Sequence, residues 1–181
     1  MTTKPITNMG NPILREVCED VSDILWHETQ QIITDLIDTL ENSPTPWVGI
    51  AAPQIWINKR ICIIHSRPTP AYPNLKERWP EAIINPSIEY HWEEILDDWE
   101  WCLSIPGIRA KVPRWKDIDI HYLDRHGVSQ RTRLTDFIAR IFQHEYDHLD
   151  GILFIDKVVD KKSFMTYDEF KIRILGNKYN K

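Results

Sequence analysis

The feature that most constrains the fold is a short motif in the last third of the chain. Residues 143–148 read Q-H-E-Y-D-H and contain the pattern H-E-x-x-H. In an α-helix, His144 and His148 lie about 40° apart around the axis, so both rings can reach one divalent metal ion. Glu145 lies about 100° from His144 and can contact a water molecule on that ion without being a ligand, which suits a general base. The motif therefore predicts a helix that carries a metal site.

The residues around the motif predict where this helix lies. At helical spacing the motif continues an apolar stripe formed by Phe137, Ile138, Ile141, Phe142 and Leu149. The stripe indicates that the motif is buried, and the face that carries residues 139, 143, 146 and 150 is expected to be wetter. Thr135 or Asp136 is expected to cap the start of the helix, and Gly151 to end it. Two histidines and a glutamate could also be hydrogen-bonded in a core without a metal, but an unpaired buried carboxylate is costly, which favours the metal.

The rest of the chain predicts strands before this late helix. One earlier amphipathic helix is expected, and a proline-rich loop at 66–80 precedes the second of the strands. The expected elements are a helix at 24–40, strands at 60–65, 82–85, 87–96, 116–123 and 128–134, and the motif helix. This order, with hairpin connections, predicts an α+β fold in which antiparallel sheets wrap a central helix. The last twenty residues carry no pattern that assigns a structure.

The composition limits the class of protein. The 181 residues, 42% of them hydrophobic, suit one domain that spans 1–181. A net charge of −5 argues against nucleic-acid binding. The first ten residues lack a secretion signal, and no apolar run approaches the ~18 residues of a membrane span, so we expect a cytoplasmic protein. The three cysteines are too few and too widely spaced for a disulfide framework.

A catalytic metal on this helix requires a third protein ligand. The metzincin pattern requires a histidine at position 154, which is Phe154 here, so that class is excluded. A thermolysin-like peptidase takes a glutamate about twenty residues after the motif, a place that Glu169 occupies within the unpatterned tail. Cys102, shortly before a Ser-Ile-Pro-Gly turn, is the other candidate. From these residues alone, either Glu169 or Cys102 could be the third metal ligand.

Three segments together resemble the signatures of the peptide deformylase family. The family has G-x-G-x-A-A-x-Q, E-G-C-x-S and Q-H-E-x-D-H, and this chain has W-V-G-I-A-A-P-Q at 47–54, E-W-C-L-S at 100–104 and Q-H-E-Y-D-H at 143–148. The resemblance covers about residues 6–160 and leaves the tail unassigned. It implies a metal-dependent hydrolase that removes the N-terminal formyl group from formyl-methionyl peptides of nascent proteins.

The resemblance also implies roles for individual residues. The implied ligands of one divalent metal are Cys102, His144 and His148. Family membership points to Fe²⁺ in the cell, while Zn²⁺, Ni²⁺ or Co²⁺ would suit the same thiolate and imidazoles in purified protein. Glu145 would take a proton from water and pass it to the departing amine. The side-chain amide of Gln54 and the backbone N–H of Leu103 would bind the developing oxyanion.

The substrate would then be an N-formylated peptide, met in transient association with the ribosome and without direct contact to nucleic acid or membrane. By the same resemblance, the backbone of Val48 and Gly49 would pair with an extended peptide as an added strand. The residues expected around its first side chain are Trp101, Phe137, Arg140 and Ile141.

The chain departs from the family pattern at four positions. Trp47 and Trp101 replace signature glycines, and Arg140 and Asp98 replace apolar residues. Trp101 is expected to narrow the entrance to the pocket, unless it packs outward. We also hypothesise that Asp98 and Arg140 form an ion pair, because a lone charge in that pocket would be costly.

These departures leave two further functions open. One is a related amidase with a different N-acyl or first-residue preference, and the other is a non-catalytic paralogue that binds peptides. The presence of Glu145 argues against the paralogue, because a binding protein has no need of a general base.

Overall fold

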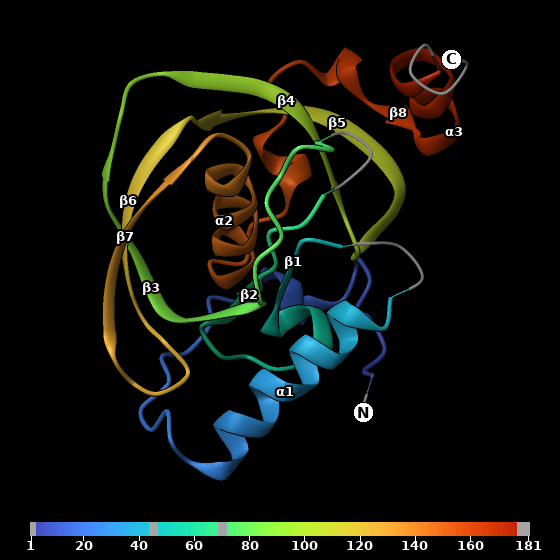
Figure 1. The fold of residues 1–181 in the computed structure, drawn as a ribbon. Coiled ribbons are helices and arrows are strands. Elements are labelled where there is room, and N and C mark those ends of the chain that lie inside the picture. Colours follow the sequence, from blue (N-terminus) through green and yellow to red (C-terminus); the bar gives the residue numbers. More distant parts are fainter. Residues whose placement is uncertain (1–2, 44–46, 69–71, 177–181) are drawn as a thin grey trace.

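The computed structural model describes residues 3–43, 47–68 and 72–176 and contains two antiparallel sheets around one helix (Figure 1). The larger sheet has the order β1-β2-β3-β6-β7, formed by Gly49–Ala51, Ile61–Ile64, Glu81–His91, Asp117–Leu123 and Ser129–Thr135. The smaller sheet has the order β4-β5-β8, formed by Ile95–Cys102, Ile105–Trp115 and Met165–Thr166. The motif helix α2, Asp136–Leu149, runs through the interior between the sheets. The predicted α+β class is confirmed.

The remaining helical elements are one longer helix and several short turns, of which η2 is fully buried. Helix α1, His27–Glu41, begins three residues later than predicted, because the Asp23 carboxylate accepts hydrogen bonds from the backbone N–H groups of Leu25 and Trp26 and forms a turn there. The short helical turns are η1 (Pro12–Arg15), η2 (Ala52–Ile55), η3 (Phe154–Lys157), η4 (Lys161–Ser163), α3 (Tyr167–Phe170) and η5 (Lys171–Leu175). No helix in the described ranges has the length and apolar character needed to cross a bilayer.

Helix α2 is buried on almost all sides. Ile141, Phe142 and Leu149 pack with residues of β2 and β6 in one hydrophobic cluster. The predicted wetter face is wrong for Ala139 and Gln143, which are buried, while Tyr146 and Asp150 are partly exposed. The Gln143 amide exchanges two hydrogen bonds with the backbone of Trp115, at 2.8 and 3.1 Å.

The ends of α2 follow the sequence closely. Thr135 occupies the predicted N-cap position, although its side chain makes no capping hydrogen bond, and the helix ends at Leu149 with Asp150 as the C-cap and Gly151 directly after it. Gly151 has φ +70°, and a Cβ there would lie 2.6 Å from the carbonyl oxygen of Arg15. Both the backbone conformation and the space therefore require glycine.

The strand predictions were wrong in several places, since β1, β4 and β8 were not predicted as strands and two further differences concern β3 and β5. Residues 82–85 and 87–96 do not form separate strands, because β3 runs through Pro86 with a register shift between Ile84 and Ser87 that accommodates the proline. Strand β5 was missed, and the turn lies at Leu103 and Ser104 rather than at Ser-Ile-Pro-Gly. A second register shift leaves the Pro106–Gly107 segment out of the pairing with β4, so these residues are tolerated within a strand.

Candidate metal centre and active site

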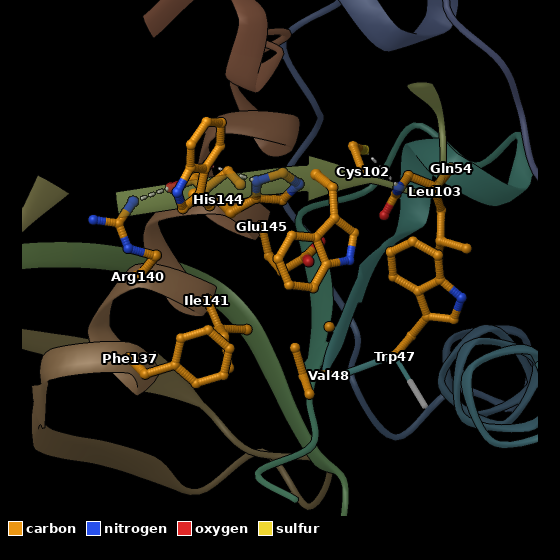
Figure 2. Close-up of a pocket in the computed structure, with 14 residues that line it drawn as sticks. Trp47, Val48, Gln54, Cys102, Leu103, Phe137, Arg140, Ile141, His144 and Glu145 are labelled. Carbon is orange, nitrogen blue, oxygen red and sulfur yellow. Dashed lines mark hydrogen bonds and ion pairs between the residues drawn. The ribbon is translucent and has the colours of Figure 1, made fainter. Parts of the chain in front are cut away.

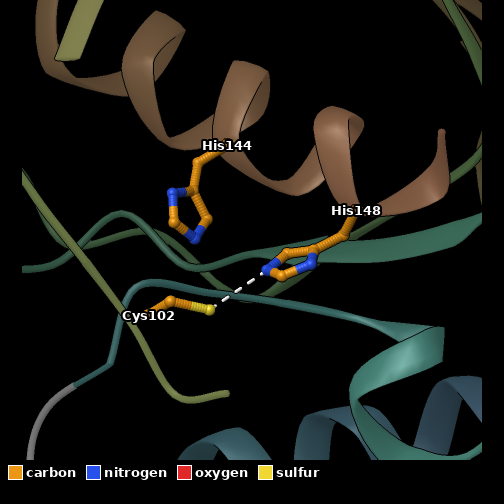
Figure 3. Close-up of side chains that lie close together, drawn as sticks. All are labelled: Cys102, His144 and His148. Carbon is orange, nitrogen blue, oxygen red and sulfur yellow. Dashed lines mark hydrogen bonds between the residues drawn. The ribbon is translucent and has the colours of Figure 1, made fainter. Parts of the chain in front are cut away.

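The three predicted metal ligands meet in the interior. Cys102 is the last residue of β4, and His144 and His148 project from α2 towards it (Figure 3). The Sγ atom of Cys102 lies 3.2 Å from Nε2 of His148, and one ligand atom from each residue lies within 4.8 Å of the other two. Since ligand atoms sit about 2.0–2.3 Å from a tetrahedral metal ion, this cluster fits a small divalent ion. Glu169, the alternative ligand, instead pairs with Arg173 at 2.6 Å in the C-terminal segment.

A buried glutamate orients the first histidine. The Nδ1 atom of His144 lies 2.9 Å from a carboxylate oxygen of Glu100, which leaves Nε2 for the metal position. Arg114 binds both oxygens of Glu100, at 2.8 and 3.0 Å, and also binds Asp147 at 2.5 Å. Burial opposes the ionisation of Glu100, but Arg114 and His144 hold its pKa well below the usual range. The ring of His144 is therefore held in place by a network of charged side chains. The same network links β4 and β5 to α2.

Sequence reasoning missed this network. Glu100 and Asp147 both stand inside the quoted signatures, and the predicted burial of the motif was a signal that Asp147 needs a partner. Arg114 carries no local signal, because its role depends on the pairing of β4 with β5.

The hypothesis that Asp98 pairs with Arg140 was wrong. The Arg140 guanidinium lies 2.8 Å from Glu100 and also donates to the backbone carbonyls of Val112 and Leu96, at 2.7 and 2.6 Å. It reaches only the backbone carbonyl of Asp98, at 3.3 Å. The Asp98 carboxylate instead accepts a hydrogen bond from the hydroxyl of Tyr72, in the loop before β3. Arg140 is therefore a buried cation whose Nη1 and Nη2 groups are both hydrogen-bonded, close to the candidate metal ligands.

Glu145 is a buried carboxylic acid in the cavity that Cys102 and His144 also line. Its carboxylate is 4% exposed, and its Oε2 atom has no hydrogen-bond partner among the described residues. Burial raises the pKa of Glu145 to about 7, and the charge on His144 opposes part of this shift. A Cβ at Gly49 would lie 3.0 Å from both Cγ and Cδ of Glu145, so only glycine leaves room for the carboxylate. The close approach of β1 therefore limits where the Glu145 carboxylate can lie.

Gln54 presents a hydrogen-bond donor beside Cys102. Its Oε1 accepts a hydrogen bond from the backbone N–H of Ala51 at 2.9 Å, which orients the amide. Its Nε2 lies 3.2 Å from the hydroxyl of Ser104 and 3.4 Å from Sγ of Cys102. Leu103, which follows Cys102 in the turn, lines the same cavity. The amide donor of Gln54 is therefore held beside the Cys102 thiol, at the wall of this cavity.

One cavity contains the predicted substrate residues (Figure 2). Its walls include Val48, Gly49, Trp101, Phe137, Arg140 and Ile141, next to Cys102, His144 and Glu145. Trp47 and Trp99 line it too, and Trp99 was not predicted. Trp101 lines the cavity, as predicted, while its ring also contacts the C-terminal segment. Strand β1 is an edge strand of its sheet among the described residues, so an extended peptide can pair with it.

Comparison with known proteins agrees with this geometry. A family model described as polypeptide deformylase matches residues 3–164. The chain is 47% identical to Peptide deformylase 2 of Nostoc sp. over 96% of both sequences, and 40% identical to Peptide deformylase 1 of Prochlorococcus marinus over 91% of this chain and 85% of the relative.

Solved structures agree as well. A class I type b peptide deformylase from Acinetobacter baumannii with bound Met-Ala-Ser superposes with a TM-score of 0.80, at 35% identity, over 87% of this chain and 99% of that one. A peptide deformylase from Synechococcus elongatus in complex with actinonin superposes with a TM-score of 0.77, at 34% identity, over 88% of this chain and 82% of that one.

Proposed function

Because this chain belongs to the peptide deformylase family, we propose that the cavity in front of Cys102, His144 and His148 is where it removes the formyl group from N-formyl-methionyl peptides. The chain is a metal-dependent deformylase, and its substrates are formylated peptides of nascent proteins. The observation that supports this site is the convergence of one thiolate and two imidazoles beside the unpartnered carboxylate oxygen of Glu145.

The proposed metal ligands are Cys102, His144 and His148. One thiolate and two imidazoles form a borderline-soft set that accepts ferrous iron, zinc, nickel or cobalt, and we propose Fe²⁺ as the ion used in the cell. When bound, such an ion polarises a carbonyl oxygen and lowers the pKa of water. The contact between Glu100 and Nδ1 keeps Nε2 of His144 directed at the ion.

Glu145 is proposed to move the proton. Its carboxylate accepts a proton from the attacking water and then delivers it to the nitrogen of the departing amine, so the formyl C–N bond breaks and formate leaves with the water oxygen. Burial by the surrounding helix and strands keeps bulk water away from this carboxylate. A carboxyl group with a pKa near 7 can act both as base and as acid at neutral pH.

The oxyanion and the peptide are proposed to be held by separate groups. The Nε2 donor of Gln54 and the backbone N–H of Leu103 stabilise the charge that gathers on the formyl oxygen. The backbone of Gly49, in the edge strand β1, is proposed to pair with the extended peptide next to Val48, whose own carbonyl already accepts a hydrogen bond from the backbone N–H of His65 at 2.8 Å. Phe137, Arg140, Ile141 and Trp101 then surround its first side chain.

Gln54→Ala is expected to lower kcat by about 10²–10³-fold, because one preorganised oxyanion donor typically contributes about 2.7–4 kcal/mol. The metal content of the variant is expected to stay unchanged, which elemental analysis of the purified protein measures beside steady-state kinetics. Ser104→Ala is the matched variant, since it removes a partner of the same amide and leaves the donor, and its effect should be much smaller. A loss of metal in proportion to the loss of activity would contradict the oxyanion role.

The function itself is tested by hydrolysis of formyl-Met-Ala-Ser by anaerobically prepared, iron-loaded protein. Release of formate and free amine at equal rates supports the proposal. Formyl peptides with other first residues serve as the comparison, because Arg140 beside the pocket makes the preference for methionine a direct question. Absence of formate release from every peptide would refute the proposed function.

We propose three further properties of the protein. Residues 1–181 form one domain, which acts in the cytoplasm. It meets its substrate during transient association with the ribosome, where formylated chains emerge. Its net charge of −5 supports contact without direct nucleic-acid binding.

A further inference from the structure

The C-terminal segment beyond the family match packs against the candidate active site. Strand β8 adds to the smaller sheet by pairing Met165 and Thr166 with Arg109 and Ile108 of β5. Helix α3, Tyr167–Phe170, follows directly. This places the segment on the same sheet as β4, which carries two tryptophans of the cavity wall and ends at Cys102 (Figure 1).

Phe170 joins this segment to both tryptophans. Its side chain is 4% exposed although α3 is a single turn, and its ring centroid lies 5.3 Å from that of Trp99 and 6.3 Å from that of Trp101. Both indoles line the cavity. Phe170 therefore packs directly behind the aromatic wall.

Arg109 forms a second link to the same wall. Its guanidinium lies 4.9 Å from the ring of Trp101 and 4.7 Å from the ring of Tyr167, so it sits between the cavity and α3. Burial lowers the pKa of Arg109 to about 10, which leaves it charged at neutral pH. Its Nη1 donates a hydrogen bond to the backbone carbonyl of Ile108 at 2.9 Å, and the two aromatic rings are its side-chain partners among the described residues.

From these contacts we infer that Phe170 and Tyr167 are positioning residues that hold Trp99 and Trp101 in the wall of the peptide-binding cavity. The inference rests on the proposed function and extends it to the C-terminal segment. The lining of the cavity in the described ranges includes both indoles but neither Phe170 nor Tyr167, so Phe170 acts on peptide binding through the indoles and Tyr167 acts through Arg109. The wall they support is apolar and suits apolar peptide side chains.

Phe170→Ala is expected to raise KM for formyl-Met-Ala-Ser about 3- to 10-fold, the range that loss of one aromatic contact supports, while kcat stays within about 2-fold. The Kd of the product peptide Met-Ala-Ser, measured by titration calorimetry, is expected to rise by the same factor. Phe170→Leu should restore most of the affinity. Ile172→Ala is the control in the same segment, because Ile172 is 70% exposed.

Tyr167→Ala keeps the inference testable if Phe170→Ala does not fold. Tyr167 is 42% exposed, so its removal leaves the core in place. It should raise KM and the Kd of Met-Ala-Ser, and Tyr167→Phe should not. Unchanged KM and Kd in a folded variant, or a fall in kcat alone, would overturn the inference. The calorimetric titrations measure peptide binding and need no turnover. A wild-type protein that binds Met-Ala-Ser but releases no formate would therefore refute the proposed function without refuting this inference.

Discussion

Glu145→Gln is expected to lower kcat by about 10²–10⁴-fold, the contribution typical of a general acid–base group. Glutamine has nearly the same shape as glutamate, so it fits the space left by Gly49, but it cannot accept the proton of the attacking water. The metal content should stay at the wild-type value, because the carboxylate is not among the three clustered ligand atoms. Formate release and elemental analysis on the same preparation measure both quantities.

The pH profile provides the control for this expectation. Burial raises the pKa of Glu145 to about 7, and only the ionised carboxylate can act as a base. Wild-type kcat/KM should therefore fall as the pH drops through about 7, or through a lower value when a bound cation favours the carboxylate. The residual activity of Glu145→Gln should lack this acid limb. A variant that keeps more than about a tenth of wild-type kcat would contradict the assigned role, given the magnitude above.

Cys102→Ala is expected to abolish activity by removing the metal. Loss of a hydrogen-bond partner of a ligand typically costs about 10- to 100-fold in metal affinity, and loss of the thiolate itself should cost more. The two imidazoles on α2 then remain alone, since the cluster of candidate ligands in the described ranges consists of these three residues. Metal content after dialysis against a chelator, followed by kinetics, gives the measurement.

A substitution at a second buried cysteine is the control that distinguishes loss of a metal ligand from loss of any buried thiol. Cys18 is also buried, at 5% exposed, but packs in the hydrophobic cluster outside the ligand group. Cys18→Ala should therefore keep its metal and most of its turnover. If Cys102→Ala retained one metal ion per chain after dialysis, the assignment of Cys102 as a ligand would fail.

Local sequence patterns were sufficient to predict the structure where it depends on the residues of a single element. The spacing of His144 and His148, the apolar stripe and Gly151 predicted α2 and its end, because all of these depend on neighbours within a few turns. The hairpin of β6 and β7 was likewise predicted, since strands were expected at 116–123 and 128–134 with a hairpin connection. The resemblance placed Cys102 beside the two histidines, which no local pattern could have done.

Local sequence patterns gave wrong or no predictions where the surroundings of a residue come from distant parts of the chain. The burial of Gln143 follows from a sheet that folds over the supposedly wet face of α2. Arg140 pairs with Glu100 rather than Asp98 because the pairing of β4 with β5 and the loop that carries Tyr72 decide which groups face it. The tail has no pattern that predicts its structure, since the buried aromatic Phe170 packs against rings some 70 positions earlier in the chain, Trp99 and Trp101.

The close approach of β1 to α2 has a consequence for engineering this protein. Any side chain at residue 49, even a methyl group, would collide with Glu145. The edge of β1 that is proposed to bind the peptide therefore cannot be redesigned independently of Glu145. A library built to alter substrate choice can vary Val48 and the cavity wall, but it has to keep residue 49 as glycine.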